Sequence, residues 1–167
     1  GVTSATEVGC NLRCKFCFSD APVKKPKTTG RFYTPKQVFD ALSKSADRYG
    51  HKLISASASE GTLGKEHLFE LLELVEKSKY IYILETNGIT IGDDPEFAKD
   101  LSRYKRLHAR VSIKGANEDE YAMLTNASKT SYNLPFKALE HLMDNNISCN
   151  ACVMISFSNK KSIESIK

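Results

Sequence analysis

The chain has 167 residues, 41% of them hydrophobic, and a net charge of +4. This length is enough for one domain with its own core and too short for two comfortable ones. The mild and dispersed charge does not demand a nucleic-acid partner, and the apolar runs are far shorter than a bilayer-spanning helix.

Residues 2–7 alternate β-branched and small side chains, which predicts a first strand. The strand leads directly into Cys10-Asn-Leu-Arg-Cys14-Lys-Phe-Cys17. Three thiolates on one short loop can hold three irons of a 4Fe-4S cube, which leaves the fourth iron open to a small molecule.

Zinc binding and disulfide formation are the two alternative uses of these cysteines. A zinc site needs a fourth ligand, and the next histidine is His51, beyond a Pro- and Lys-rich loop. A disulfide would leave an odd thiol and needs an oxidising compartment, whereas we expect a protein without a secretory leader. The spacing therefore favours the open cluster over zinc, in a cytoplasmic protein.

The following elements alternate between helix and strand. Residues 21–31 are interpreted as a mobile loop. Thr34 and Gln37 can form a capping box around Pro35, and Gly50 is typical of a helix end. Further strands are expected at residues 52–57, 80–85, 107–114 and 147–157, with helices around residues 68–75, 94–101, 117–124 and 135–142 and a last one opening after 157. This order predicts an α/β fold with a parallel sheet and helices outside.

Residues 107–114 point to the functional face of that sheet. Leu107, Ala109, Val111 and Ile113 alternate with His108, Arg110, Ser112 and Lys114. A strand covered by helices on both faces would be apolar throughout, and burying cations in a dry core is costly. We therefore expect a wet cavity on the inner side of a curved sheet, with an exposed face on an edge strand as the alternative.

The cysteine spacing, with aromatic Phe16 before the third cysteine, resembles the signature of the radical S-adenosylmethionine (radical SAM) superfamily. Other segments resemble that family's pattern: Ser57 to Leu63, Thr86-Asn87-Gly88, Ser112-Ile-Lys114 and Val153-Met-Ile155. The likeness implies a partial (β/α) barrel, in which six strands are usual and five are visible here. Residues 1–167 would form a single core domain whose sixth strand has been removed, is naturally missing, or is replaced by a partner at the sheet edge.

The resemblance also implies a site. Cys10, Cys14 and Cys17 would bind a 4Fe-4S cluster, and S-adenosylmethionine would be held by Phe16, Ala58, Ser59, Glu60, Thr86, Asn87, Ser112, Lys114 and Ile155. The family has Gly-Gly-Glu-Pro where this chain has Ala58-Ser59-Glu60-Gly61. Because glycine permits close backbone approach, Ala58 and Ser59 are expected to crowd the ligand or change the turn.

The implied activity is reductive cleavage of S-adenosylmethionine to a 5′-deoxyadenosyl radical that abstracts hydrogen from an unidentified substrate, with a flavodoxin or ferredoxin as electron donor. Residues 115–125 also resemble glycyl-radical activating enzymes, which would act on a protein partner. The departures at Ala58 and Ser59 leave a third hypothesis, a non-catalytic iron-sulfur or zinc module.

Several residues were not assigned to the cluster. Cys149 and Cys152 lie three apart on an expected strand, so their thiols should point to opposite faces as buried strand cysteines. His51, His67 and His141 are interpreted as turn or helix-surface residues. His108 is placed deep in the cavity, and Arg110 and Asn150 are candidates to face a substrate.

Overall fold

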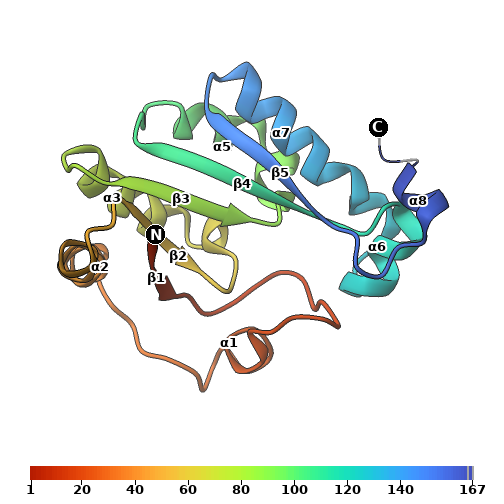
Figure 1. Cartoon of the computed structure of the whole chain (residues 1–167), viewed down its shortest axis with the longest axis horizontal. Helices are drawn as coiled ribbons and strands as arrows, with labels where there is room; N and C mark the ends of the chain where they lie inside the picture. Colours follow the sequence, from red (N-terminus) through yellow and green to blue (C-terminus); the bar gives the residue numbers. More distant parts are fainter. Residues whose placement is uncertain (165, 167) are drawn as a thin grey trace.

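The computed structural model describes residues 1–164 and 166. Within them, five parallel strands form one open sheet in the order β1-β2-β3-β4-β5 (Figure 1). The strands are β1 (Val2–Thr6), β2 (Leu53–Ser57), β3 (Ile81–Thr86), β4 (Leu107–Lys114) and β5 (Ser148–Met154). The predicted α/β fold, a partial barrel with a parallel sheet and surrounding helices, is confirmed.

Helices connect the strands, as parallel pairing requires. They are α1 (Asp20–Lys24), α2 (Pro35–Tyr49), α3 (Lys65–Glu76), α4 (Ile89–Asp93), α5 (Pro95–Leu101), α6 (Glu118–Thr125), α7 (Leu134–Asp144) and α8 (Lys160–Glu164), with short 3-10 turns at Gly61–Leu63 and Lys129–Asn133. None of the described helices is long and apolar enough to cross a membrane. The predicted last helix is α8, and the part of that prediction on residues 165 and 167 lies outside the described residues.

Two short helices were not predicted. The expected mobile loop at 21–31 is wrong at its start, because α1 forms there and Val23 is buried. Thr29 Oγ1 donates to the carbonyls of Ala21 and Lys25, which folds the rest of this segment back on α1. Helix α4 begins directly after Gly88, in the segment that resembles the family's Thr-Asn-Gly pattern.

The expected start of α2 is confirmed in detail. Thr34 Oγ1 accepts from Gln37 N at 3.2 Å, and Gln37 Oε1 accepts from Thr34 N at 2.9 Å. The helix ends at Gly50, which has a φ of +68°. These bonds satisfy backbone donors that the first helical turn leaves free, so local sequence alone fixes where the helix begins.

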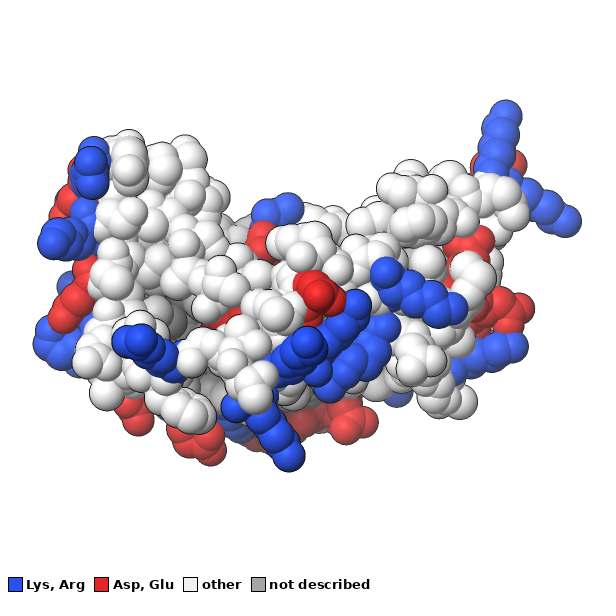
Figure 2. All heavy atoms as spheres, turned by 90° about the horizontal axis from the view of Figure 1, so that it is seen from below, with Lys and Arg blue, Asp and Glu red and all other residues white. Residues whose placement is uncertain are grey.

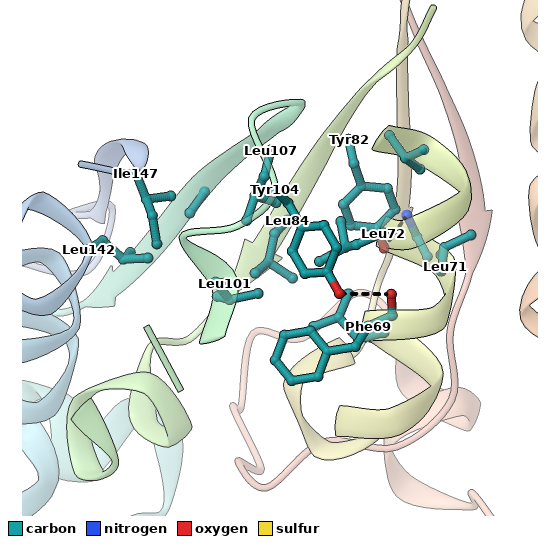
Figure 3. Packing of buried hydrophobic residues seen from close by; sticks show 14 of the residues in the cluster. Phe69, Leu71, Leu72, Tyr82, Leu84, Leu101, Tyr104, Leu107, Leu142 and Ile147 are labelled. Atoms are coloured by element: carbon teal, nitrogen blue, oxygen red, sulfur yellow. Dashed lines mark hydrogen bonds between the residues drawn. The ribbon is translucent and has the colours of Figure 1, made fainter. Parts of the chain in front are cut away.

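The helix-covered face of the sheet forms the core. Leu107, Ala109 and Val111 of β4 are 3%, 0% and 0% exposed, and they pack with side chains of α3, α5 and α7 (Figure 3). Two buried tyrosines have hydrogen-bond partners for their hydroxyls. Tyr104 Oη donates to Phe69 O at 3.3 Å, and Tyr82 Oη accepts from Ala56 N at 3.2 Å. The buried phenols therefore carry little desolvation cost.

The opposite face of the sheet is polar and hollow. A cavity of about 470 Å³ is lined by residues of all five strands, among them Ser55, Glu85, His108, Arg110 and Asn150. Because β4 pairs with both β3 and β5, its polar face is not that of an edge strand. The predicted wet cavity is confirmed, with His108 in its lining as expected.

The strand cysteines point to opposite faces, as predicted. Cys149 packs against the core, whereas Cys152 accepts a hydrogen bond from Asn150 Nδ2 at 3.3 Å on the cavity face. Both thiols are free and half-buried, so the expectation that they are fully buried is wrong.

Helices α4 and α7 meet at an unusually close backbone contact. A Cβ added to Gly92 in α4 would lie 2.0 Å from Leu134 O and 2.7 Å from Leu134 C. His141 Nδ1 of α7 also lies 2.9 Å from Ile91 O. This packing fixes α4, and with it the loop that ends β3, against the rest of the fold.

We predict that Gly92→Ala lowers the free energy of unfolding by about 3 kcal/mol, because the clash is with backbone atoms that cannot rotate away. Urea unfolding followed by circular dichroism measures the change. Gly64→Ala is the control, since its added methyl meets nothing closer than 3.9 Å. Equal stability losses in the two variants would contradict the proposed contact.

Candidate functional site

The cysteine loop lies between β1 and α1 and is held by backbone hydrogen bonds from several directions. Gly9 N donates to Pro22 O at 3.0 Å, and Arg13 N donates to Thr125 O at 3.1 Å. Lys15 N donates to Leu124 O at 2.8 Å. The thiols of Cys10, Cys14 and Cys17 are free and half-buried, so the loop is ordered while its sulfurs stay partly accessible.

The loop after β2 is bonded directly to the cysteine loop. Glu60 N donates to Gly9 O at 3.0 Å, and Ser59 Oγ donates to Glu7 O at 2.8 Å. Ala58 has a φ of +74°, a conformation that glycine adopts freely and alanine does not. The turn thus keeps a glycine-like shape without glycine.

The carboxylate of Glu60 is 3% exposed and accepts hydrogen bonds at both oxygens. Oε1 accepts from Thr62 Oγ1 and Thr86 Oγ1, each at 2.6 Å, and Oε2 accepts from Asn87 N at 2.7 Å. Burial raises the pKa of Glu60, while these donors oppose the rise. Sequence reasoning missed this role, in which Glu60 joins the loops after β2 and β3.

Asn87 extends this network to the cysteines. Its Nδ2 donates to Asn11 Oδ1 at 2.6 Å and lies 3.8 Å from Cys10 Sγ. The loops after β1, β2 and β3 are therefore connected through Glu60 and Asn87. Three separately predicted motifs meet at one end of the sheet.

The end of β4 supplies a cation to the same region. Lys114 Nζ lies 6.0 Å from the centre of the Phe16 ring, and both side chains are half-buried. Burial raises the pKa of the Cys14 thiol, and the Lys114 ammonium opposes that rise. Ser112 lies two residues earlier on the same polar face of β4.

The segment after β5 is less well described by the prediction. Ile155 lies beyond the end of β5 and is 39% exposed. Phe157 instead contacts the site, because its ring centre lies 5.5 Å from that of Phe16. The sequence could have indicated Phe157, because it is an aromatic residue between two serines and lies two positions after Ile155, on the same face of an extended strand.

The donor set fits an iron-sulfur cube. The loop offers three partly accessible thiols, with Leu12 N donating to Cys10 Sγ at 3.4 Å. Among the described residues, no three His, Cys, Asp or Glu side chains converge as they would around a single metal ion. In a cube each thiolate binds a different iron, so its three sulfurs surround a cluster rather than one point.

Each of the four histidines has a hydrogen-bond partner within the fold. His51 bonds to Thr3 Oγ1 at 2.9 Å, and His67 Nε2 lies 3.1 Å from Tyr33 O. His108 bonds to Ser148 Oγ and Asn150 Oδ1, both at 2.8 Å, on the cavity face. Arg110 Nη1 donates to Glu85 Oε1 at 2.9 Å in the same cavity.

The family model described as "Radical SAM superfamily" matches residues 6–167. The chain belongs to the radical SAM superfamily. It is thereby placed among enzymes that use a 4Fe-4S cluster and S-adenosylmethionine. No curated protein matches it.

Solved structures with this radical SAM fold include SuiB of Streptococcus suis, which is 16% identical with a TM-score of 0.75 over 98% of this chain and 35% of SuiB. The protein anSMEcpe, solved with bound S-adenosylmethionine, is 20% identical with a TM-score of 0.70 over 99% of this chain and 48% of its own. HydG, a maturase of FeFe-hydrogenase, is 13% identical with a TM-score of 0.73 over 99% of this chain and 37% of its own. The chain thus spans less than half the length of these proteins.

We predict that Ala58→Gly raises the free energy of unfolding by about 1 kcal/mol, because it relieves the left-handed backbone conformation. Thermal or urea unfolding measures the gain. Ala41→Gly, at an exposed position in α2, should change stability in the opposite direction by a similar amount. A loss of stability in both variants would refute strain at Ala58.

Glu7, at the end of β1, is a second carboxyl group beside this network. A Cβ added to Gly61 would lie 2.8 Å from Glu7 Oε2, so the carboxyl packs against the loop after β2. Burial, and secondarily the charge of Glu60, raise the pKa of Glu7 to about 7. The folded state therefore binds this proton more tightly than the unfolded chain does.

The proton on Glu7 contributes to the free energy of unfolding below pH 4.5, and this contribution is lost as the pH rises through 7. We predict that Glu7→Gln is more stable than the parent at pH 8 by about 2 kcal/mol and nearly equal to it at pH 4.5. Urea unfolding across this range measures the difference. A difference that does not vary with pH would show that Glu7 does not titrate as proposed.

Proposed function

We propose that Cys10, Cys14 and Cys17 hold a 4Fe-4S cluster and that the chain cleaves S-adenosylmethionine reductively. When bound, the cluster supplies the electron that releases a 5′-deoxyadenosyl radical for hydrogen abstraction from a substrate. The observation that carries this proposal is the connected network from Asn11 through Asn87 to Glu60. This network connects the cysteine loop with the loops after β2 and β3, to which the resemblance assigns the binding of S-adenosylmethionine.

The chain's own residues would bind and orient that cofactor. Lys114 suits the carboxylate, and Ser112 suits a ribose hydroxyl on the same strand face. Phe16 and Phe157 offer aromatic surface for adenine, with Ile155 at the edge. Thr86 is 2% exposed and bonded to Glu60, so we assign it a positioning role.

The loop after β2 would hold the methionine amino group. Glu60, Ala58 and Ser59 belong to this loop, and Asn87 borders it. Because both Glu60 oxygens already accept hydrogen bonds, an ammonium group would have to use their remaining lone pairs. The loop is therefore organised before any ligand binds, which lowers the ordering cost of binding.

We place the substrate in the cavity of about 470 Å³ on the polar face of the sheet. Glu85 and Arg110 neutralise one another there, so the cavity suits a neutral or zwitterionic group better than a polyanion. Ser55 lines this cavity, and its buried Oγ lacks a hydrogen-bond partner among the described residues.

A peptide segment is the substrate class that we favour. Amide groups can exchange hydrogen bonds with Ser55, Asn150 and His108 without adding charge. SuiB, which shares the fold, has been solved bound to its precursor peptide SuiA. A protein partner that receives a glycyl radical would be a special case of such a peptide substrate.

The test is anaerobic reconstitution with iron and sulfide, followed by dithionite and S-adenosylmethionine. We predict 5′-deoxyadenosine from the parent, and loss of both the brown absorbance and this product in Cys14→Ala. Cys149→Ala is the control, because that thiol packs against the core and should leave both readouts unchanged. An intact cluster without 5′-deoxyadenosine would favour a non-catalytic module, and full iron occupancy in Cys14→Ala would refute the ligand assignment.

A further inference from the structure

The segment from Cys10 to Arg31 is far more basic than the rest of the chain. It contains six Lys or Arg residues and one acidic residue, Asp20, whereas the net charge of all 167 residues is +4. The excess of cations in this segment thus accounts for the whole positive charge of the protein. We call its exposed basic side chains the basic face: Arg13, Lys15, Lys24, Lys25, Lys27 and Arg31.

The basic face lies beside the cysteine loop in space. Gly9 N donates to Pro22 O at 3.0 Å, which holds α1 against the loop. Figure 1 shows this segment as a long excursion below β1 and β2 that carries α1. Figure 2 views the molecule from that side, and Lys and Arg side chains gather near its centre.

Apolar side chains accompany these cations. Phe18 directly follows Cys17 and is 91% exposed, and Phe32 directly follows Arg31 and is fully exposed. Val8, at the start of the cysteine loop, is also exposed at 40%. Exposed aromatic residues among charges are typical anchors of a protein interface, whereas cations alone would mark only a solvated surface.

We propose that the basic face is the docking surface for an acidic one-electron donor protein of the flavodoxin type. The inference rests on the proposed function, because it is the cluster on Cys10, Cys14 and Cys17 that needs the electron. One electron leaves the donor's reduced flavin and enters the cluster, and no bond is made or broken. Positive charge around the loop attracts an acidic donor, and Phe18 and Phe32 hold it there.

The observations favour a protein over a nucleic acid as this partner. The cations surround the loop that would receive the electron and lie on a different element from the polar cavity lining of β2 to β5. The exposed rings of Phe18 and Phe32 among these cations suit the surface of a folded protein. The position of the face matches electron delivery.

The experiment uses the reconstituted parent and the triple variant Lys25→Glu, Lys27→Glu, Arg31→Glu. These three side chains are exposed and lie outside the cofactor-binding residues. The control is Lys44→Glu, Lys77→Glu, Lys137→Glu, the same charge change on exposed residues of α2, α7 and the end of α3. The readout is the rate of cluster reduction by purified, reduced flavodoxin, followed by the cluster's absorbance without S-adenosylmethionine.

At low salt, we expect flavodoxin to reduce the triple variant at least tenfold more slowly than the parent. Added salt should slow the reduction of the parent by screening the charges, and it should not slow the reduction of the triple variant further. Reduction by dithionite, and dithionite-driven cleavage of S-adenosylmethionine, should be unchanged in both variants. Phe32→Ala should weaken flavodoxin binding about fivefold, measured by calorimetry, with the same salt dependence as the parent.

Several results would overturn the proposal. The first is an unchanged rate of reduction by flavodoxin in the triple variant, and the second is an equal loss of rate in the control variant. The third is that the parent binds RNA in a gel-shift assay and the triple variant does not, while both are reduced by flavodoxin at the same rate. Failure of the parent to cleave S-adenosylmethionine with dithionite would count against the proposed function alone, because flavodoxin reduction and binding are measured without cleavage.

Discussion

The site depends on one buried carboxylate. Glu60 is held by Thr62, Thr86 and Asn87, so the loops after β2 and β3 share a single anchor. A buried charge is tolerated only when donors compensate for its lost hydration, so removing any one of them would loosen both loops. Asn87 then passes this order to the cysteine loop through Asn11. The geometry around the three cysteines is thus set by loops that hold one another.

The two faces of the sheet divide stability from chemistry. On β4, Ala109 and Val111 are fully buried under the helices, while His108 and Arg110 face the cavity from the alternate positions. Helices α4 and α7 close the core side at Gly92, where the backbones touch. A change on the core side should alter stability, and a change on the polar side should alter binding. Backbone strain at Ala58 lies at the end of the sheet where the cysteine loop and the loops after β2 and β3 meet, and such strain is common at functional sites.

Most elements could be predicted because their signals are local. The capping box at Thr34 and the alternation along β4 each specify a structure within a few residues. Helices α1 and α4 were missed because five residues are too few to show helical periodicity. The contact of Phe157 with Phe16 was missed for another reason, since the chain beyond β5 must turn back before the two rings can meet.

The sequence by itself determined the three thiols, the order of strands and helices, and the polar face of β4, because each follows from side-chain chemistry and spacing. Only the tertiary structure decided that Glu60 anchors two loops, that Ala58 adopts a glycine conformation in a loop bonded to the cysteine loop, and that Phe157 contacts Phe16. These features depend on contacts between residues far apart in the chain. Such contacts are fixed by tertiary packing, which a short sequence pattern does not predict.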